Sequence, residues 1–471
     1  MGSSLRMLLV VLYGCAFIAG FNENLMNMAL VSIMGQFAID AVMAQWLVTG
    51  YMIVVTVVVA CMAYLYRRFS LRALFFAAAA LNIAGSLGGM ASGGFVSLLL
   101  FRIVQALGAG VFIPLMMNVV VQRVPRQNLG ACLALGSSMI TIGPATAPIV
   151  TGFLVSQFGW ASVFCVPLDF GVLFAILGWF VVRDERQPVR GRFDGLSALL
   201  MAGGVTLLSV GLAAVSSQPV VGLGEMALAV LLLAAFALRQ QRCSHPLVSL
   251  KPLRLRAFWP AAVLVMVTMM TYFSLSVVTP LYFEQAAGMS ASMAGLMLLL
   301  PVCAHAGAAV VSGRQLDRRG EWPLMPLGMA IALTGLLMMV AGALLPVMPL
   351  VVGGVFLGYL GTGMLLSPSQ TAGLRRLSPQ LHSHGVSLMG MALQLAACLG
   401  PALYVGVMSS VTEAAQQAGA PLAWAASQGF GAAMAVAAVI CAGGLAAAAA
   451  YAAFMRKRPY GGPEDEAAAG E

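Results

Sequence analysis

Three ionisable side chains lie deep inside long apolar stretches of the sequence: Glu23, Arg102 and Asp169. A carboxyl group removed from water is easier to protonate, so it can take up and release a proton near neutral pH. An arginine keeps its charge and needs a partner, because an unpaired charge is costly in an apolar interior. These residue types indicate proton transfer or the binding of a charged ligand.

The surroundings of the two acids differ. Glu23 lies in an asparagine-rich segment, and on a helix Glu23 and Asn27 share one face, which suits a polar site. The alternative is a carboxyl group held by structural hydrogen bonds. Asp169 has no polar neighbour in the sequence except Ser162. We therefore expect Glu23 to be the principal titrating group and Asp169 the secondary one.

Two further side chains have a functional and a structural interpretation. Arg102 either couples protonation to conformation or is a structural arginine bonded to backbone carbonyls. His305, also in an apolar segment, could shuttle protons. We favour a neutral histidine that is hydrogen-bonded to a neighbour.

The composition identifies the elements that position these residues. The chain has 471 residues, of which 61% are hydrophobic and 8% charged, too few polar groups to cover a soluble domain. Apolar runs near the ~20 residues needed to cross a bilayer recur along its whole length, and in lipid they must be helices. The sequence predicts an all-α integral membrane protein with fourteen spans. We place them at 7–30, 43–65, 72–92, 96–120, 129–155, 160–182, 194–215, 222–240, 258–284, 291–313, 323–345, 347–372, 385–411 and 425–455.

The basic residues support this number of spans. All 24 Lys and Arg residues then lie in alternate loops or at the chain ends, except Arg102. Because Lys and Arg stay on the cytoplasmic side of membranes, both termini are predicted to be cytoplasmic. The charges are scattered between spans and not gathered on one face, so nucleic acid is not expected as a partner.

Several function classes lack the residues that they need. No polar stretch is long enough for a soluble catalytic domain, and no His or Cys set at metal-ligand spacing accompanies the acids. Neither Lys251 nor Lys457 follows a glycine, as the lysine of a phosphate-binding loop would. We expect no enzyme activity, metal or cofactor. Because the phosphate-binding loop of an ATP-driven pump is missing, the energy for any uphill transport must come from an ion gradient or from another subunit.

Several segments carry motifs in a fixed order. They are NMAL at 27–30, QWLVTGY at 45–51, LLLFRIVQALGAG at 98–110, GSSMITIGPATAPIVTG at 136–152, PLYFEQAAGMSASMAG at 280–295 and SGRQLDRRG at 312–320. In this order and spacing the chain resembles the major facilitator superfamily, and within it the fourteen-helix drug:proton antiporter branch.

The resemblance implies the major facilitator fold, with two six-helix bundles around a central cavity and two inserted helices at the periphery. The expected units are an N-terminal bundle at 1–182, a linker with inserted helices 7 and 8 at 183–257, a C-terminal bundle at 258–455 and a cytoplasmic tail at 456–471. Arg102 should point inward, toward helix 1, 5 or 6.

The resemblance also implies roles for two motifs. A gating motif in helix 5 comprises Gly143, Pro144, Pro148 and Gly152, although ordinary proline and glycine usage is the alternative. A loop motif that locks the inward-closed state comprises Gly313, Asp317, Arg318 and Gly320, with Asp317 near the start of the following helix. The chain departs from the family at Asn22, where helix 1 normally carries an aspartate, and in the loop between helices 2 and 3, where Arg67 replaces an acid.

These features predict a secondary active transporter that couples proton entry to efflux of amphipathic small molecules by alternating access. The residues expected to bind protons and substrate near the central cavity of this transporter are Glu23, Asp169, Arg102 and Asn27. The alternatives are an exporter of one metabolite, siderophore or lipid, and a non-transporting sensor on the same fold. The expected environment is the inner cell membrane, with protons, substrates and the lipid bilayer as partners of a monomer. A periplasmic adaptor is a further candidate partner.

Overall fold

The structure of the protein, a computed structural model, describes residues 3–39, 41–184, 193–214, 218–243, 246–320 and 322–457. The described chain is helical throughout and contains no strand. Fourteen of its helices are long and apolar enough to cross a membrane, as predicted.

The spanning helices follow the predicted segments closely. They are α1 (Ser3–Asn24), α3 (Ala41–Arg68), α4 (Leu71–Met90), α5 (Phe95–Arg123), α6 (Leu129–Phe158), α7 (Cys165–Val181), α8 (Gly195–Ala214), α9 (Pro219–Arg242), α10 (Trp259–Gln285), α11 (Ala291–Arg319), α12 (Leu324–Leu344), α13 (Met348–Arg375), α14 (His382–Gln417) and α15 (Leu422–Lys457). Short helical segments are α2 (Leu30–Phe37), η1 (Arg126–Asn128), η2 (Trp160–Phe164), which leads into α7, and η3 (Lys251–Arg254).

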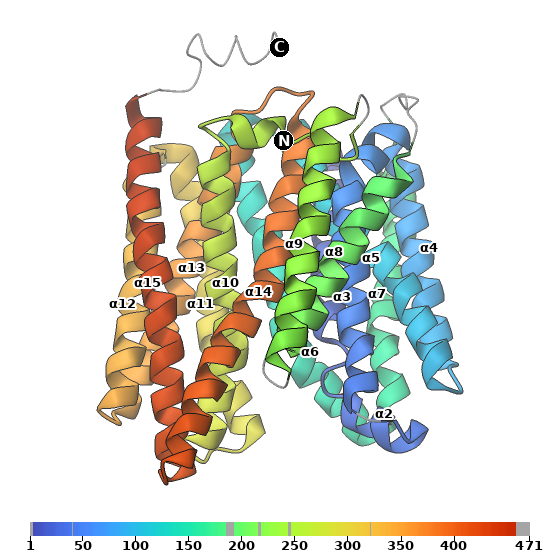
Figure 1. Cartoon of the computed structure of the whole chain (residues 1–471). Coiled ribbons are helices and arrows are strands. Elements are labelled where there is room, and N and C mark those ends of the chain that lie inside the picture. The colour runs from blue at the N-terminus through green and yellow to red at the C-terminus, as the bar shows by residue number, and fades with distance from the viewer. Residues whose placement is uncertain are drawn as a thin grey trace.

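The spanning helices form two groups that stand side by side (Figure 1). In the first group α1 packs on α5, α6 and α7, and α5 packs on α3 and α4. In the second, α13 packs on α10, α11 and α12, and α15 packs on α10, α12 and α14. The groups meet where α6 contacts α11 and α13, and where α14 contacts α3 and α5. Helices α8 and α9 pack on each other, and α8 also touches α3 and α14.

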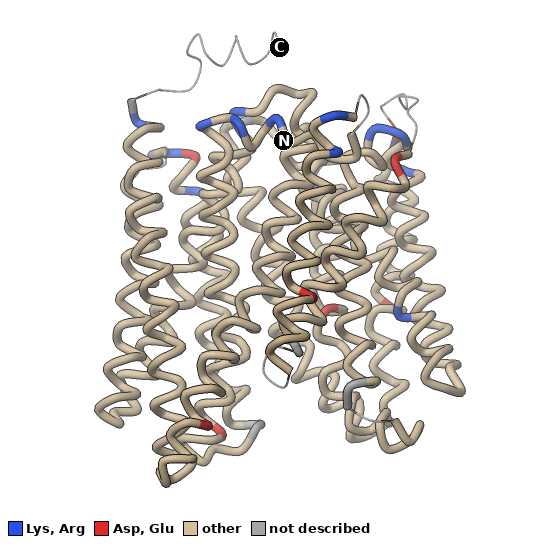
Figure 2. The backbone as a smooth tube through the Cα atoms, in the orientation of Figure 1, with Lys and Arg blue, Asp and Glu red and all other residues tan. Residues whose placement is uncertain are grey.

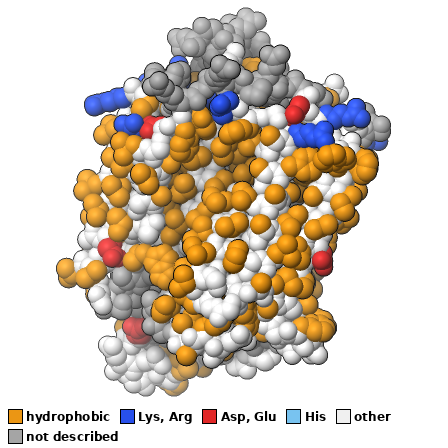
Figure 3. Space-filling view, turned by 90° about the vertical axis from the view of Figure 1, so that its right-hand side faces the viewer, with side chains coloured by type: hydrophobic (Ala, Val, Ile, Leu, Met, Phe, Trp, Pro, Cys, Tyr) orange, Lys and Arg blue, Asp and Glu red, His pale blue; other side chains and the backbone are white. Residues whose placement is uncertain are grey.

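Charge divides the bundle along its length. Lys and Arg gather at one end, where α1 begins and α15 ends (Figure 2). We call this the basic end and the opposite one the far end. Hydrophobic side chains cover the outer face below these charges (Figure 3), as a lipid-facing surface requires. Arg102 is the exception, because it lies within α5 and is fully buried. That the basic end is cytoplasmic stays a prediction.

Two of the helix ends that differ from the predicted ones concern site residues. Helix α1 ends at Asn24 rather than at residue 30, because asparagine favours local side-chain hydrogen bonds over a continued helix. Helix α11 continues to Arg319 rather than stopping at residue 313. It ends at Gly320, whose φ of 77° is accessible to glycine. Asp317 therefore lies in the last turn of α11, not near the start of the next helix.

Candidate functional site

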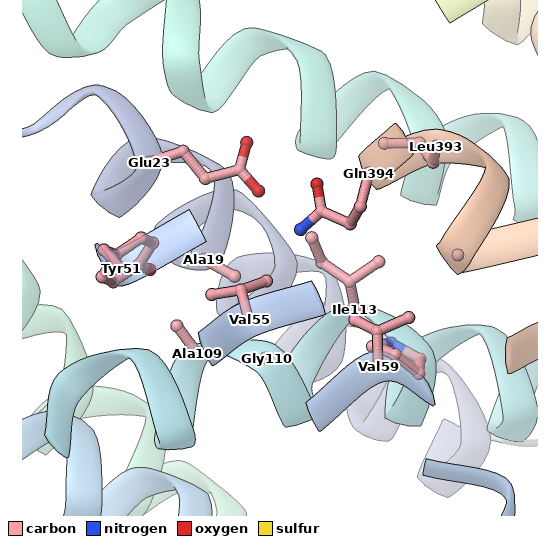
Figure 4. A pocket seen from close by; sticks show the side chains of 12 residues that line it. Ala19, Glu23, Tyr51, Val55, Val59, Ala109, Gly110, Ile113, Leu393 and Gln394 are labelled. Atoms are coloured by element: carbon pink, nitrogen blue, oxygen red, sulfur yellow. The ribbon is translucent and has the colours of Figure 1, made fainter. Parts of the chain in front are cut away.

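Glu23 lies in the last turn of α1 and is 3% exposed. Its carboxyl group faces a small cavity between α1, α3, α5 and α14, which we call the central chamber (Figure 4). The chamber has a volume of about 20 Å³, room for about one water molecule. Its lining is Ala19, Glu23, Tyr51, Val55, Val59, Ala109, Gly110, Ile113, Pro114, Gly390, Leu393 and Gln394.

Arg102 holds the residue before Glu23. Its Nη2 donates to the Asn22 carbonyl at 2.6 Å, its Nε to the Leu47 carbonyl at 3.4 Å, and its Nη1 to Gln105 Oε1. Because α1 ends at Asn24, the Asn22 carbonyl has no partner within the helix, and a cation is favourable at a helix C-terminus. Arg102 therefore points inward to α1, as expected, and the contacts are those of an arginine bonded to backbone carbonyls.

The same region contains a buried polar network in the first helix group. Asn22 Nδ2 donates to Asn82 Oδ1 at 3.0 Å, and Asn82 Nδ2 donates to the Pro167 carbonyl at 3.1 Å. Gln105 Nε2 donates to Ser86 Oγ at 2.9 Å. Side chains from α1, α4 and α5 are thus tied together beside Glu23.

The two prolines of α6 hold the residue after Glu23. Each proline removes the helix bond to the carbonyl four residues earlier, which frees the carbonyls of Ile140 and Pro144. Asn24 Nδ2 donates to the freed Pro144 carbonyl at 3.1 Å. The freed Ile140 carbonyl faces Gly20 of α1, where an added Cβ would lie within 2.7 Å of it. Pro144 and Pro148 therefore create the acceptor and the space that seat the end of α1 on α6.

The two glycines of the gating motif differ. At Gly143 an added Cβ would lie 2.5 Å from the Phe17 carbonyl, so this glycine permits close contact with α1. At Gly152 the nearest atom is Met28 Cγ at 3.9 Å, so no close approach requires glycine there. The structure thus brings Gly143 to the α1–α6 interface with Pro144.

Glu23 has no cationic partner among the described residues. Within the part of the chain that the structure describes, Glu23 forms no ion pair, and Arg102 is directed to the Asn22 carbonyl instead. The side chain that faces the Glu23 carboxyl group across the chamber is Gln394 of α14, an uncharged amide (Figure 4). A buried carboxylate without a cation is unfavourable, so this geometry favours a protonated carboxyl group.

A much larger cavity, of about 480 Å³, lies beside the central chamber. We call it the wide cavity. Its lining consists mainly of α3, α8 and α14 residues, namely Gln45, Val48, Thr49, Met52, Ile53, Thr56, Val205, Leu208, Ser209, Leu212, Gln394, Leu395, Ala397, Cys398, Pro401, Ala402, Val405, Gly406 and Ser409, with Asn27 and Val277. None of the described residues that line it is charged. Gln394 lines both cavities, so it lies between Glu23 and the wide cavity.

The position of α8 corrects one prediction. The two inserted helices were expected to be peripheral, yet Ser209 and three other α8 residues line the wide cavity. Ser209 Oγ lies 3.5 Å from Cys398 Sγ of α14. The reason is that α8 packs against both α3 and α14, whereas α9 packs chiefly on α8. Only α9 matches the expected periphery.

The remaining proton- and substrate-binding candidates do not join Glu23. Asp169 is exposed on α7 next to Phe170, which is 39% exposed, and it lines neither cavity. This face of α7 points out of the bundle, so the expectation of Asp169 near the cavity is wrong. Asn27 is exposed in the turn after α1 and lines the wide cavity. It does not share a helix face with Glu23, because α1 ends between them.

His305 lies in a separate polar cluster of the second helix group. The fully buried His305 contacts the Tyr359 carbonyl at 3.2 Å and Thr362 Oγ1 at 3.1 Å through Nδ1. The Tyr272 ring packs against the same imidazole at an interplanar angle of 44°, with centroids 4.6 Å apart. These contacts agree with a histidine bonded to its neighbours.

Asp317 joins the two helix groups at the basic end. Its carboxylate accepts hydrogen bonds from the backbone N–H groups of Gly130 and Ala131, both at 2.9 Å, and pairs with Arg375 at 3.3 Å. Gly130 and Ala131 begin α6, so the acid binds N–H groups that have no partner within the helix. Gly313 lies against the Gly130 carbonyl, with room for no side chain. Arg318 takes no part in these Asp317 contacts with Gly130, Ala131 and Arg375, and Gly320 ends the helix.

Sequence reasoning missed Gln394, Tyr51 and Asn82. Tyr51 lines the central chamber, with its ring centroid 4.0 Å from the Arg102 guanidinium carbon, and Asn82 anchors Asn22. Asn82 and Gln394 are uncharged polar residues within apolar spans, and that signal was available in the sequence.

Comparison with known proteins agrees with this architecture. Residues 12–401 match the family model for the Major Facilitator Superfamily. An uncharacterized MFS-type transporter, YcnB of Bacillus subtilis (strain 168), is 30% identical over 441 residues, which are 91% of each chain. Lincomycin resistance protein LmrB of Listeria monocytogenes is 28% identical over 84% of each chain. The crystal structure of the human organic anion transporter MFSD10 (TETRAN) superposes with a TM-score of 0.68 at 12% identity, covering 95% of this chain and 100% of that one.

Proposed function

The chain belongs to the major facilitator superfamily of transporters, and we propose that it exports amphipathic small molecules in exchange for protons. Membership makes it a multi-pass membrane transporter and not an enzyme. The resistance protein among its relatives supports a drug-like substrate. Its bacterial relatives support the cell membrane as its location.

The observation that carries the proposal is the position of Glu23. This carboxyl group is buried, lacks a cationic partner among the described residues, and is separated from the wide cavity by Gln394. Water or substrate that enters from the wide cavity can change its charge state, because either one supplies the solvation or counter-charge that the chamber lacks. Protonation and substrate binding at Glu23 then exclude each other.

Mutual exclusion is sufficient to couple two flows. When Glu23 is protonated, the central chamber is neutral and the far end can close around it. When Glu23 has lost its proton, the negative charge of the carboxylate must be neutralised before the far end can close. Only a substrate with a positive or strongly hydrogen-bonding group supplies that compensation. The cycle therefore exchanges one solute for the other.

Alternating access needs two ends that open in turn. Contacts between the helix groups close the basic end, where Asp317 binds the start of α6. The wide cavity lies in the far half, since its α3 lining begins at Gln45, close to the far-end start of that helix. If the basic end is cytoplasmic, as its charge favours, this arrangement faces outward.

Substitution of Glu23 by glutamine tests the proposal. In everted vesicles that carry a preset pH gradient, addition of lincomycin or ethidium should dissipate the gradient with the wild-type protein and not with Glu23→Gln. Asp169→Asn is the matched control, since Asp169 is an acid within a span that lines neither cavity. It should retain exchange.

Two outcomes would count against the proposal. Uphill transport by Glu23→Gln at the wild-type rate, with unchanged pH dependence, would make Glu23 a structural residue. If no compound of a broad panel dissipates the gradient in wild-type vesicles, the hypothesis that the protein exchanges drug-like compounds for protons is refuted. A single saturable compound without competition by the others would instead identify an exporter of one metabolite.

A further inference from the structure

We propose that α8, one of the two inserted helices, is a wall of the substrate site and selects substrates by the size of their apolar part. This inference rests on the proposed function for the identity of the ligand. The contact of α8 with the cavity is tested independently below.

The sequence of α8 has a face suited to this role. The four residues that line the wide cavity, Val205, Leu208, Ser209 and Leu212, follow the spacing i, i+3, i+4 and i+7 of one helical face. A second face, which carries Gly204 and Gly211, packs on α9. An added Cβ at Gly211 would lie 2.9 Å from the Gly222 carbonyl. The helix is thus built to contact α9 on one face and the cavity on the other.

A polar network outside the cavity fixes α8 at the basic end. Asp194, just before α8, forms an ion pair with Arg239 of α9 at 3.0 Å and accepts from Ser197 Oγ at 2.6 Å. Gln240 Nε2 donates to Ser197 Oγ at 2.6 Å, and the Val248 N–H donates to Gln240 Oε1 at 3.1 Å. Two helices and the following linker therefore hold the base of α8, which favours a rigid wall.

The chemistry of the cavity assigns an orientation to the ligand. The α8 wall is aliphatic except for Ser209, whereas Gln45, Thr49, Thr56 and Gln394 on α3 and α14 supply uncharged hydrogen-bonding groups. Glu23 lies beyond Gln394. An amphipathic molecule would place its apolar body against α8 and its polar or cationic head toward Gln394. The volume of about 480 Å³ falls in the range of sites for drug-sized ligands.

A native cysteine provides a direct test of the wall. Ser209 Oγ and Cys398 Sγ are 3.5 Å apart, so Ser209→Cys should place two thiols within reach of a disulfide. Oxidation with copper phenanthroline in membranes should cross-link Ser209→Cys to Cys398, as detected by peptide mass spectrometry. Thr206→Cys, on the same helix but not in the lining, and the double variant Ser209→Cys/Cys398→Ser are controls without the cross-link.

The cross-link distinguishes this inference from the proposed function. No Ser209–Cys398 disulfide, or equal cross-linking of Thr206→Cys, would overturn the α8 wall even if Glu23→Gln abolishes exchange. If the Ser209→Cys–Cys398 disulfide forms but Glu23→Gln still exchanges protons, α8 remains a wall of the cavity and the proposed coupling through Glu23 is refuted. If α8 lines the substrate site and Glu23 couples the two flows, the Ser209→Cys–Cys398 disulfide should stop export, and a reductant should restore it.

Size selection is tested by filling the cavity from α8. Leu212→Trp should raise the KM for ethidium, whose fused aromatic rings give it the larger apolar part, by about tenfold and that for lincomycin, a polar amino-sugar derivative, by less. Leu199→Trp, at a residue of α8 that is 70% exposed, is the control that should change neither. An equal effect of Leu212→Trp on both probes, or an effect of Leu199→Trp as large, would refute selection by α8.

Discussion

Replacement of Asp317 by asparagine should open the basic end without unfolding the protein. Asp317 is 6% exposed and accepts two backbone N–H groups at 2.9 Å, while Arg375, 17% exposed, pairs with it at 3.3 Å. Its contacts join α11 to α6 and α13, so two of them cross between the helix groups. Separation of α6 from α11 at the basic end would break these two contacts.

The magnitude follows from what asparagine can keep. Its one carbonyl oxygen retains a single N–H bond, and the amide nitrogen faces the other N–H group. Loss of one charge-assisted bond costs about 1.5–3 kcal/mol, and loss of the charge at the helix N-terminus costs a further ~0.3–1 kcal/mol. A total of about 2–4 kcal/mol shifts the closed-to-open ratio by about 30- to 1,000-fold, because 1.4 kcal/mol is a factor of ten.

Accessibility of a single engineered cysteine measures this shift. Ser367, fully buried, donates to the Gly130 carbonyl at 3.3 Å across the same interface, so Ser367→Cys in a cysteine-free background reports opening. Asp317→Asn should raise its maleimide labelling rate at least tenfold. Asp184→Asn is the matched control, since Asp184 binds the Arg72 N–H within one helix group. Unchanged labelling in Asp317→Asn would refute the argument that this acid closes the basic end.

Three further outcomes are expected. Pro144→Ala should straighten α6 and slow switching more than it weakens binding, measured as transport rate against probe affinity. Arg102→Lys should lower the free energy of unfolding by about 1–3 kcal/mol in thermal melts, because one ammonium cannot satisfy the Asn22 carbonyl and its other acceptors together. Arg239 beside Asp194 holds the pKa of that carboxyl well below its usual range. Its stabilising contribution is therefore present above about pH 4 and lost as the pH falls further. Asp194→Asn should remove that pH dependence from the melting temperature.

The number and order of spans could be predicted because they depend on local composition. A run of apolar residues must form a helix in lipid whatever its neighbours are, and basic residues mark one side of the membrane. The inward direction of Arg102 also followed, since a buried charge must find a partner. Each of these inferences needs only the residue type and its depth in a span.

The rotation of each helix about its axis could not be predicted in the same way. It is set by packing against neighbours, and hydropathy carries little of that information in a membrane protein. Asp169 and Glu23 are both acids within spans, yet one is exposed on α7 and the other is buried. For the same reason the sequence did not predict the role of Gln394, which depends on the rotation of α14 toward Glu23. Nor did it predict which face of α8 lines the wide cavity.

Among the described residues, Arg102 pairs with no carboxylate, and this leaves the charge of Glu23 without a fixed counter-ion. Relatives that the helix-1 motif resembles carry an aspartate where this chain has Asn22, and here Arg102 binds the carbonyl of that residue instead. The next residue, Glu23, is an acid whose carboxyl group faces Gln394 across the central chamber (Figure 4). An arginine beside the acid would stabilise the carboxylate at every step of a cycle. Without that ion pair, the proposed cycle needs a proton or a substrate to neutralise Glu23, and the two would be exchanged for one another.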